Sequence, residues 1–146
     1  MFKRILLATD GSAASAHAIA LAVGLARGGA ARITAVYVVD PYPFMGVGET
    51  NPTGFQAYMA AAQRQAERAH ASVTQACGQG GPAVDLQLRC IEEMSPAAGI
   101  LKAAVDEGAD LIVVGSHGRT GLNRLVLGSV AAKVVAQSPV PVLVAR

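Results

Sequence analysis

Three glycines and a serine have the spacing of an anion-binding loop. Nine residues separate Gly115 and Gly118 from Gly128 and Ser129. Glycine has no Cβ, so an anion such as a phosphate can approach the backbone closely at these positions. The hydroxyl group of Ser129 can donate a further hydrogen bond. The pattern therefore predicts a loop that holds an anionic ligand through backbone N–H groups.

The segments on either side place this loop between a strand and a helix. Residues 110–114 (DLIVV) form an apolar run that predicts a buried strand, and residues 129–137 are rich in Ala and Val and predict a helix. A helix N-terminus offers N–H groups without intrahelical partners and the positive end of the helix dipole. The spacing differs from the Gly-Lys-Ser/Thr phosphate loop and from the G-x-G-x-x-G dinucleotide motif.

Three charged or titratable residues lie inside the loop. Arg119 and Arg124 supply positive charge, and a phosphate contact and an ordinary surface position are about equally good interpretations of both. His117 has no nucleophile or second acid placed to partner it in the sequence, so we predict no catalytic residue.

The rest of the chain alternates strands with helices. Further strands are predicted at residues 2–9, 32–39, 84–90 and 140–145, and further helices at residues 13–27, 55–76 and 96–107. Ser12 is the expected N-cap of the first helix, and Gly28 and Gly29 are expected to end it. This alternation is typical of a Rossmann-like α/β fold, with a parallel sheet and helices on both faces. We expect one domain over residues 1–146 and the strand order 3-2-1-4-5.

Ligands of such sheets bind at the carboxyl ends of the strands where the strand order reverses. Here that point lies between the first and fourth predicted strands, which end at Asp10 and Gly115. Asp10 could contact a ligand, and it could also simply shape the turn after the strand. The topology and the glycine pattern indicate the same place.

The glycine loop resembles the ATP-binding signature of the universal stress protein family. The opening FKRILLATDGS, the VYVVD of residues 36–40 and the closing SPVPVLVAR are similar to that family's first, second and last strands. The resemblance covers the whole chain, and residues 41–54 match least. It implies a fold like that of the adenine nucleotide α-hydrolases. It also implies an ATP-binding regulator or binding module in the stress response.

The resemblance assigns roles to individual residues. It implies phosphate contacts from the glycine loop with Arg119 nearby, nucleoside contacts from Asp10 and Val38, and lesser contacts from Val114 and Val130. Mg²⁺ is expected to come with ATP rather than with a dedicated cage of carboxylates.

Two other classes of function stay open. One is a nucleotide-handling enzyme, either an ATPase or a protein that transfers adenylyl groups. The sequence shows no convincing base to activate water and no P-loop lysine, so any hydrolysis should be slow. The other is an interaction protein that binds no nucleotide, and the intact glycine pattern counts against it.

Composition excludes several kinds of partner. The net charge is +2 without any Lys/Arg run, which argues against nucleic acid and membrane surfaces. Cys77 and Cys90 lack the spacing of a zinc or redox motif and are interpreted as reduced thiols. We find no signal peptide and no apolar stretch of about 20 residues, and therefore expect a cytoplasmic protein.

His17 and His70 fall on predicted helices and are expected to face solvent.

Two further expectations concern surfaces. Residues 40–54 form a Pro/Gly-rich loop, and we expect its Tyr42, Phe44 and Met45 to fold over the adenosine side of the site. The last strand should lie at an apolar sheet edge, which natural proteins usually cover. The family resemblance implies that two such strands pair across a twofold axis, so we predict a homodimer through the C-terminal strand.

Overall fold

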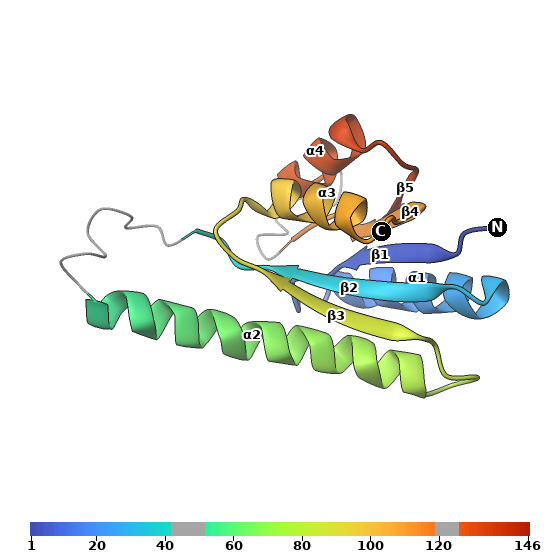
Figure 1. The fold of residues 1–146 in the computed structure, drawn as a ribbon, viewed down its shortest axis with the longest axis horizontal. Helices are drawn as coiled ribbons and strands as arrows, with labels where there is room; N and C mark the ends of the chain where they lie inside the picture. Colours follow the sequence, from blue (N-terminus) through green and yellow to red (C-terminus); the bar gives the residue numbers. More distant parts are fainter. Residues whose placement is uncertain (42–51, 119–125) are drawn as a thin grey trace.

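The computed structural model describes residues 1–41, 52–118 and 126–146. Strands and helices alternate along these residues, as the sequence predicts (Figure 1). The elements are β1 (Arg4–Ala8), α1 (Ser15–Gly29), β2 (Arg32–Val38), α2 (Pro52–Gly78), β3 (Leu86–Ile91), α3 (Pro96–Asp106), β4 (Leu111–Gly115), α4 (Ser129–Gln137) and β5 (Val142–Ala145). The helix that follows the glycine loop has the predicted bounds.

The strands form one parallel sheet in the order β3-β2-β1-β4-β5, which confirms the predicted topology. Strand β1 lies in the centre, where Ile5 pairs with Ile33 of β2 on one side and with Leu111 of β4 on the other. A central strand of a parallel sheet is covered on both faces, which explains why its sequence is continuously apolar rather than alternating.

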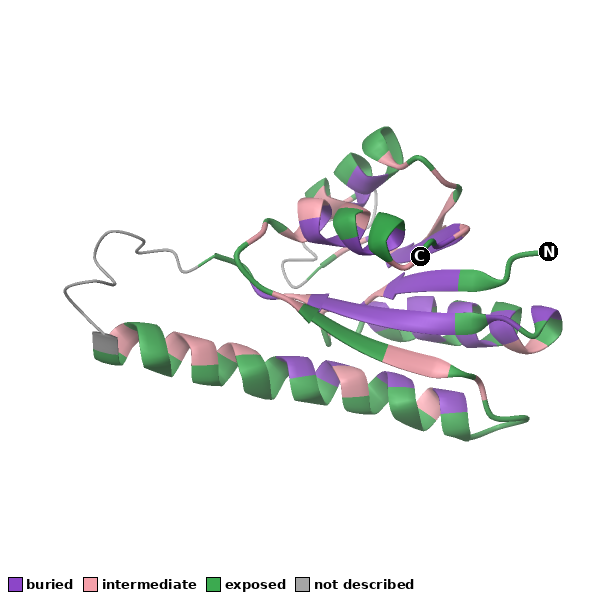
Figure 2. Ribbon diagram, viewed as in Figure 1, coloured by how far each residue is buried: buried purple, intermediate pink, exposed green. Residues whose placement is uncertain are grey.

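Helices cover both faces of the sheet. α1 and α2 lie on one face, and α3 and α4 lie on the other (Figure 1). Ile5 and Leu7 belong to the core under α1 and α2, whereas Leu6 belongs to the core under α3 and α4. Figure 2 shows this burial as continuous purple along the inner strands. Neighbouring residues of β1 thus point to opposite cores, as the period of a strand requires.

The start and end of α1 differ from the prediction. Ser12 is not its N-cap, because the helix begins at Ser15 and Ala14 occupies the cap position without a side-chain bond. The carbonyl oxygen of Ser12 accepts a hydrogen bond from the Ser15 N–H group at 3.1 Å and another from its hydroxyl at 2.6 Å. An extra turn therefore precedes the helix. At the other end the helix includes Gly29, and Ala30 adopts the left-handed conformation with φ of 49°.

The apolar stripe of α2 is covered only in part. Ala66, Ala69 and Val73 are buried, as expected for a core face. Phe55 near the start of the helix is 44% exposed. Figure 1 shows the reason, because this end of α2 extends beyond the sheet. No helix among the described residues is long and apolar enough to cross a membrane.

The expectation that His70 faces solvent is wrong, while His17 is exposed as predicted. His70 is half-buried between α2 and the edge strand β3, and its Nε2 atom is enclosed without a hydrogen-bond partner. Burial lowers the pKa of His70, and a hydrogen bond with the Arg89 backbone opposes that shift. β3 is covered incompletely, since Leu88 is 44% exposed.

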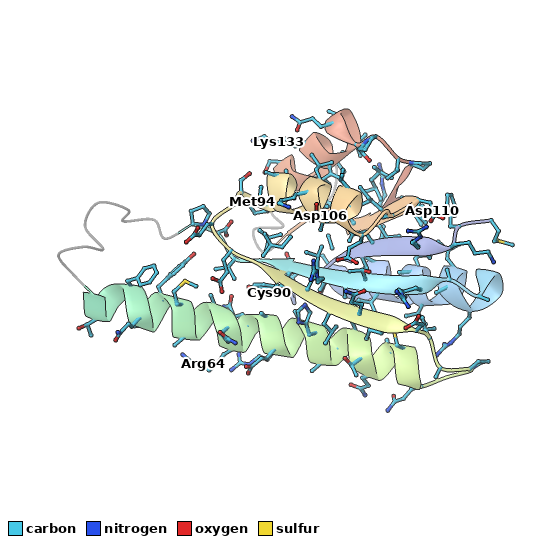
Figure 3. All side chains as sticks on the ribbon, viewed as in Figure 1. Arg64, Cys90, Met94, Asp106, Asp110 and Lys133 are labelled. Atoms are coloured by element: carbon cyan, nitrogen blue, oxygen red, sulfur yellow. The ribbon has the colours of Figure 1, made fainter. Side chains whose placement is uncertain are left out.

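The amino ends of β1 and β4 are tied together by Asp110, which lies beside the start of β1 (Figure 3). Its carboxylate accepts hydrogen bonds from the backbone N–H groups of Lys3 at 2.8 Å and Arg4 at 3.0 Å. These bonds add to the ladder between the two central strands. The opposite ends of the same two strands carry the candidate site.

Candidate functional site

The carboxyl ends of β1 and β4 border a pocket of about 340 Å³. It lies where the strand order reverses, because β1 pairs with β2 on one side and β4 on the other. Eight of the nine residues that the sequence predicts for the site line this pocket: Asp10, Val38, Val114, Gly115, Gly118, Gly128, Ser129 and Val130. The ninth, Arg119, lies outside the described residues, as do Arg124, Tyr42, Phe44 and Met45.

Ser116 holds the two ends of the glycine loop together. Its carbonyl oxygen accepts a hydrogen bond from the Gly128 N–H group at 2.8 Å, and its own N–H group donates to Ala145 of β5 at 2.7 Å. A Cβ on Gly128 would lie 3.0 Å from that carbonyl oxygen. Gly128 therefore permits the backbone of the loop's second end to approach Ser116 closely. This contact brings Gly128 to the same pocket as Gly115 and Gly118.

Gly118 is not required for a positive φ angle. Among the described glycines a positive φ occurs only at Gly11, Gly80, Gly81 and Gly108. A Cβ on Gly118 would meet Oδ2 of Asp10 at 3.4 Å, an ordinary contact distance. A side chain at position 118 would thus occupy pocket space rather than strain the backbone.

Two helices begin at the pocket. Gly128 is the N-cap of α4, and Ser129, Val130 and Ala131 of its first turn line the pocket. Ser15, the first residue of α1, lines it as well. Backbone N–H groups in a first helical turn have no carbonyl partner within the helix, and the helix dipole is positive there. In α1 the N–H groups of Ser15 and Ala16 already donate to the carbonyl oxygens of Ser12 and Ala13, so it is the N-terminus of α4 that makes this end of the pocket favourable for an anion.

Asp10 holds the turn between β1 and α1. Its Oδ1 atom accepts a hydrogen bond from the Ser12 N–H group at 2.9 Å. Its Oδ2 atom lies on the side of Gly118 in the pocket. The structural interpretation of Asp10 is therefore correct for one carboxylate oxygen, and it leaves room for a ligand contact at the other.

The side of the pocket formed by β2 and α3 is mostly apolar, with Asp40 after β2 as its charged residue. Val36 and Val38 of β2 and Pro96 and Ile100 of α3 line it. The family resemblance pointed to Val38, but Pro96 and Ile100 were missed. The sequence identified α3 only as a helix that covers the sheet, and no pattern within it marks the turn that reaches the pocket.

Buried polar residues in the wall were also missed. Thr9, Ser15 and Ser116 line the pocket and are 5%, 5% and 6% exposed. The hydroxyl of Ser116 is hydrogen-bonded to Nδ1 of His117 at 2.8 Å, so it orients the imidazole ring in the pocket wall. A polar residue directly after a buried strand is the signal that could have found Thr9 and Ser116.

Acidic residues are sparse in this part of the molecule. Asp10 and Asp40 are the carboxylates of the described pocket wall. Within residues 1–41, 52–118 and 126–146, no group of three or more His, Cys, Asp or Glu side chains could hold a metal ion. The described wall therefore fits an anion with an apolar group attached better than it fits a bare metal ion.

Comparison with known proteins gives this architecture a family. The profile of the universal stress protein family matches residues 1–146. The chain belongs to this family. The resemblance seen in the glycine loop and in the first, second and last strands is thereby confirmed.

Individual universal stress proteins support the relation over the whole chain. One from Thermus aquaticus is 39% identical over 146 residues, which cover 100% of both chains. The solved structure of the hypothetical protein MJ0577 from Methanocaldococcus jannaschii is similar with a TM-score of 0.81 and 26% identity, covering 99% of this chain and 96% of that one. A universal stress protein crystallised in complex with cAMP is similar with a TM-score of 0.62 and 26% identity, covering 99% and 97% of the two chains. These likenesses confirm the Rossmann-like fold.

Proposed function

We propose that this universal stress protein binds ATP, together with Mg²⁺, in the pocket between β1 and β4. The observation that carries the proposal is the arrangement of one anion-binding end and one apolar end within a single pocket at the topological switch. A nucleotide has the same division, with charged phosphates at one end and a flat base at the other.

The phosphates belong at the end formed by the glycine loop. Gly115, Gly118, Gly128 and Ser129 surround this end, and the first turn of α4 faces it. The hydrogen bond between Gly128 and Ser116 holds the two described ends of the loop together at the pocket. Backbone N–H groups at a helix start are a favourable environment for phosphate oxygens. Arg119 is proposed to add charge from the neighbouring part of the loop.

The nucleoside belongs at the opposite end. Val38 and Ile100 offer apolar surface for a base, and Val114 and Val130 also line the pocket. The Oδ2 atom of Asp10 is available on the pocket side as an acceptor for a ribose hydroxyl or for a water on the metal ion. The related protein crystallised with cAMP supports an adenine nucleotide as the ligand.

Hydrolysis is proposed to be slow at most. The described pocket wall contains no lysine that could stabilise a leaving phosphate in the manner of a P-loop. It also lacks a carboxylate cage for magnesium, so the metal would arrive bound to the phosphates. We therefore propose a nucleotide-dependent regulator or binding module in the stress response rather than a fast enzyme. Both cysteines are free thiols, which fits a reducing compartment such as the cytoplasm.

Mass spectrometry of ligand carried through native purification tests the proposal. We expect an adenine nucleotide in the wild-type protein and little of it in a Gly118→Val variant, whose side chain would extend into the phosphate end beside Asp10. A ligand without an adenine base, or equal nucleotide in both proteins, would contradict the assignment. The same measurement distinguishes ATP from ADP and AMP.

A further inference from the structure

Helix α3 approaches strand β2 at a point where a glycine faces a valine. A Cβ on Gly99 would lie 2.8 Å from Cγ2 and 2.9 Å from Cγ1 of Val38. Carbon atoms in contact normally stay about 3.5–4.0 Å apart. Any larger residue at position 99 would therefore require Val38 or the helix to move.

Val38 is held in place by the sheet. It pairs with Ile91 of β3, and the N–H group of the following residue, Val39, donates to the Ile91 carbonyl at 2.8 Å. The β-branched side chain of valine also has few favourable rotamers on a strand. The position of its two methyl groups is thus set from one side by the strand and from the other by the bare backbone of Gly99.

The same contact borders the apolar end of the pocket. Val38 lines the pocket from β2, while Pro96 and Ile100 line it from α3. Gly99 lies between these two residues along the helix and is itself buried. The close approach at Gly99 therefore fixes the separation of the two apolar walls.

We propose that the absence of a side chain at Gly99 sets the depth of the apolar end, which makes Gly99 a positioning residue for the base of the bound nucleotide. This inference rests on the proposed nucleotide function. A methyl group at position 99 would push Val38 toward the base, or move α3 and carry Ile100 away from it. Both changes weaken contacts to the base. The phosphate end is built from β4 and α4, and we expect it to change less than the apolar end.

Calorimetric titration with two probes tests this role. The probes are MgATP and inorganic tripolyphosphate with Mg²⁺, which has the phosphates but no nucleoside. The proteins are wild type, Gly99→Ala, the double variant Gly99→Ala/Val38→Ala, and Gly24→Ala as a control. Gly24 lies on the exposed face of α1, where a Cβ would meet nothing within 4 Å.

In Gly99→Ala we expect MgATP affinity to fall about tenfold, as for overpacking of a fitted apolar site. Affinity for tripolyphosphate should stay within about twofold of wild type, because that probe makes no contact with Val38. The double variant should recover part of the lost MgATP affinity, because the clash is gone but the contact of the Val38 methyl groups with the base is lost as well. Gly24→Ala should bind both probes as the wild type does.

Other outcomes would overturn the inference. These are unchanged MgATP affinity in Gly99→Ala, an equal loss for both probes, and no recovery in the double variant. A wild-type protein that binds MgATP but not tripolyphosphate would contradict the division into two ends. A wild-type protein that binds neither probe would instead refute the proposed nucleotide function, so the two failures are distinguishable.

Discussion

A Cβ on Gly118 would lie 3.4 Å from Oδ2 of Asp10, although the two residues follow different strands of the sheet. This proximity joins the turn after β1 to the glycine loop after β4. The other oxygen of the same carboxylate, Oδ1, accepts the Ser12 N–H group at 2.9 Å. Asp10 therefore stabilises the turn with one oxygen and faces the pocket beside Gly118 with the other.

Replacing Asp10 by Asn separates these two roles. The amide oxygen can still accept the Ser12 N–H bond, so we expect the free energy of unfolding to change little. At the pocket side, a charged acceptor is replaced by a neutral group, which weakens a hydrogen bond by about 1 kcal/mol. We predict that MgATP affinity falls about fivefold, as measured by calorimetry. Tighter binding than wild type would mean that the Asp10 charge repels the ligand, and our assignment would be wrong.

The contact between Gly128 and Ser116 predicts a cost in stability. In Gly128→Ala the added Cβ would lie 3.0 Å from the Ser116 carbonyl oxygen, so the hydrogen bond between the two residues must lengthen. We expect a loss of about 1–2 kcal/mol in the free energy of unfolding, measured in urea. Gly24→Ala is the matched control and should be neutral or stabilising, because alanine favours an exposed helix position. Equal stability of the two variants would show that Gly128 is not needed for the close approach.

His70 predicts a pH dependence of stability. Burial lowers its pKa in the folded protein, so the unfolded chain binds the proton more readily. The free energy of unfolding therefore contains a contribution from neutral His70 that is fully present above about pH 6.5, the usual pKa of an unfolded histidine. This contribution decreases as the pH falls below that value. Glu67 of α2 lies beside His70, whereas Arg89 of β3 contacts His70 through its backbone and pairs its side chain with Glu107 at 2.9 Å. We expect the urea midpoint of the wild type to fall more than that of His70→Gln between about pH 7.5 and 5.5.

Both proteins retain His17 and His117, so the comparison isolates the substitution at position 70. Parallel curves over the whole range would show that His70 has the same proton affinity in the folded and unfolded chains.

The assembly of the protein also stays a prediction. β5 is an edge strand, since it pairs with β4 on one side only within the described sheet. Val142, Leu143 and Val144 of this strand are only partly buried. An apolar edge of this kind is usually covered in natural proteins. We predict a homodimer that pairs β5 with its copy, and light scattering at micromolar concentration should give twice the mass of the chain. A monomeric mass would count against it.

The order of the strands and the place of the pocket could be predicted because they depend on long-range patterns. Apolar runs such as residues 110–114 fix where strands lie, and the alternation with helices fixes the topology. Local details were less predictable. Ser12 has the residue type of an N-cap, but its N–H group donates to the carboxylate of Asp10 in the turn after β1. The helix begins three residues later, at Ser15.

The residues of the pocket wall could likewise be predicted only in part. The glycines were recognisable because backbone approach requires that residue type. Pro96 and Ile100 were not, because their role depends on how closely α3 packs on β2. We attribute that distance to the close approach of Gly99 to Val38. The hydrophobic periodicity of the sequence does not indicate which residues of two elements meet. His70 was misjudged for a related reason, since its burial depends on the placement of the edge strand β3 beside α2.

Thermal unfolding with and without MgATP, in wild type, Ser129→Ala and Gly118→Val, tests the central claim most directly. A ligand that binds only the folded state stabilises it by about 2.7 kcal/mol at one hundred times its Kd. Ser129→Ala removes one donor, so its binding free energy should weaken by about 1 kcal/mol and its thermal shift should be smaller. Gly118→Val should unfold near the wild-type temperature without ligand, because Gly118 has no positive φ, and should show almost no shift with MgATP. Equal shifts in all three proteins would place the phosphates elsewhere and contradict the account.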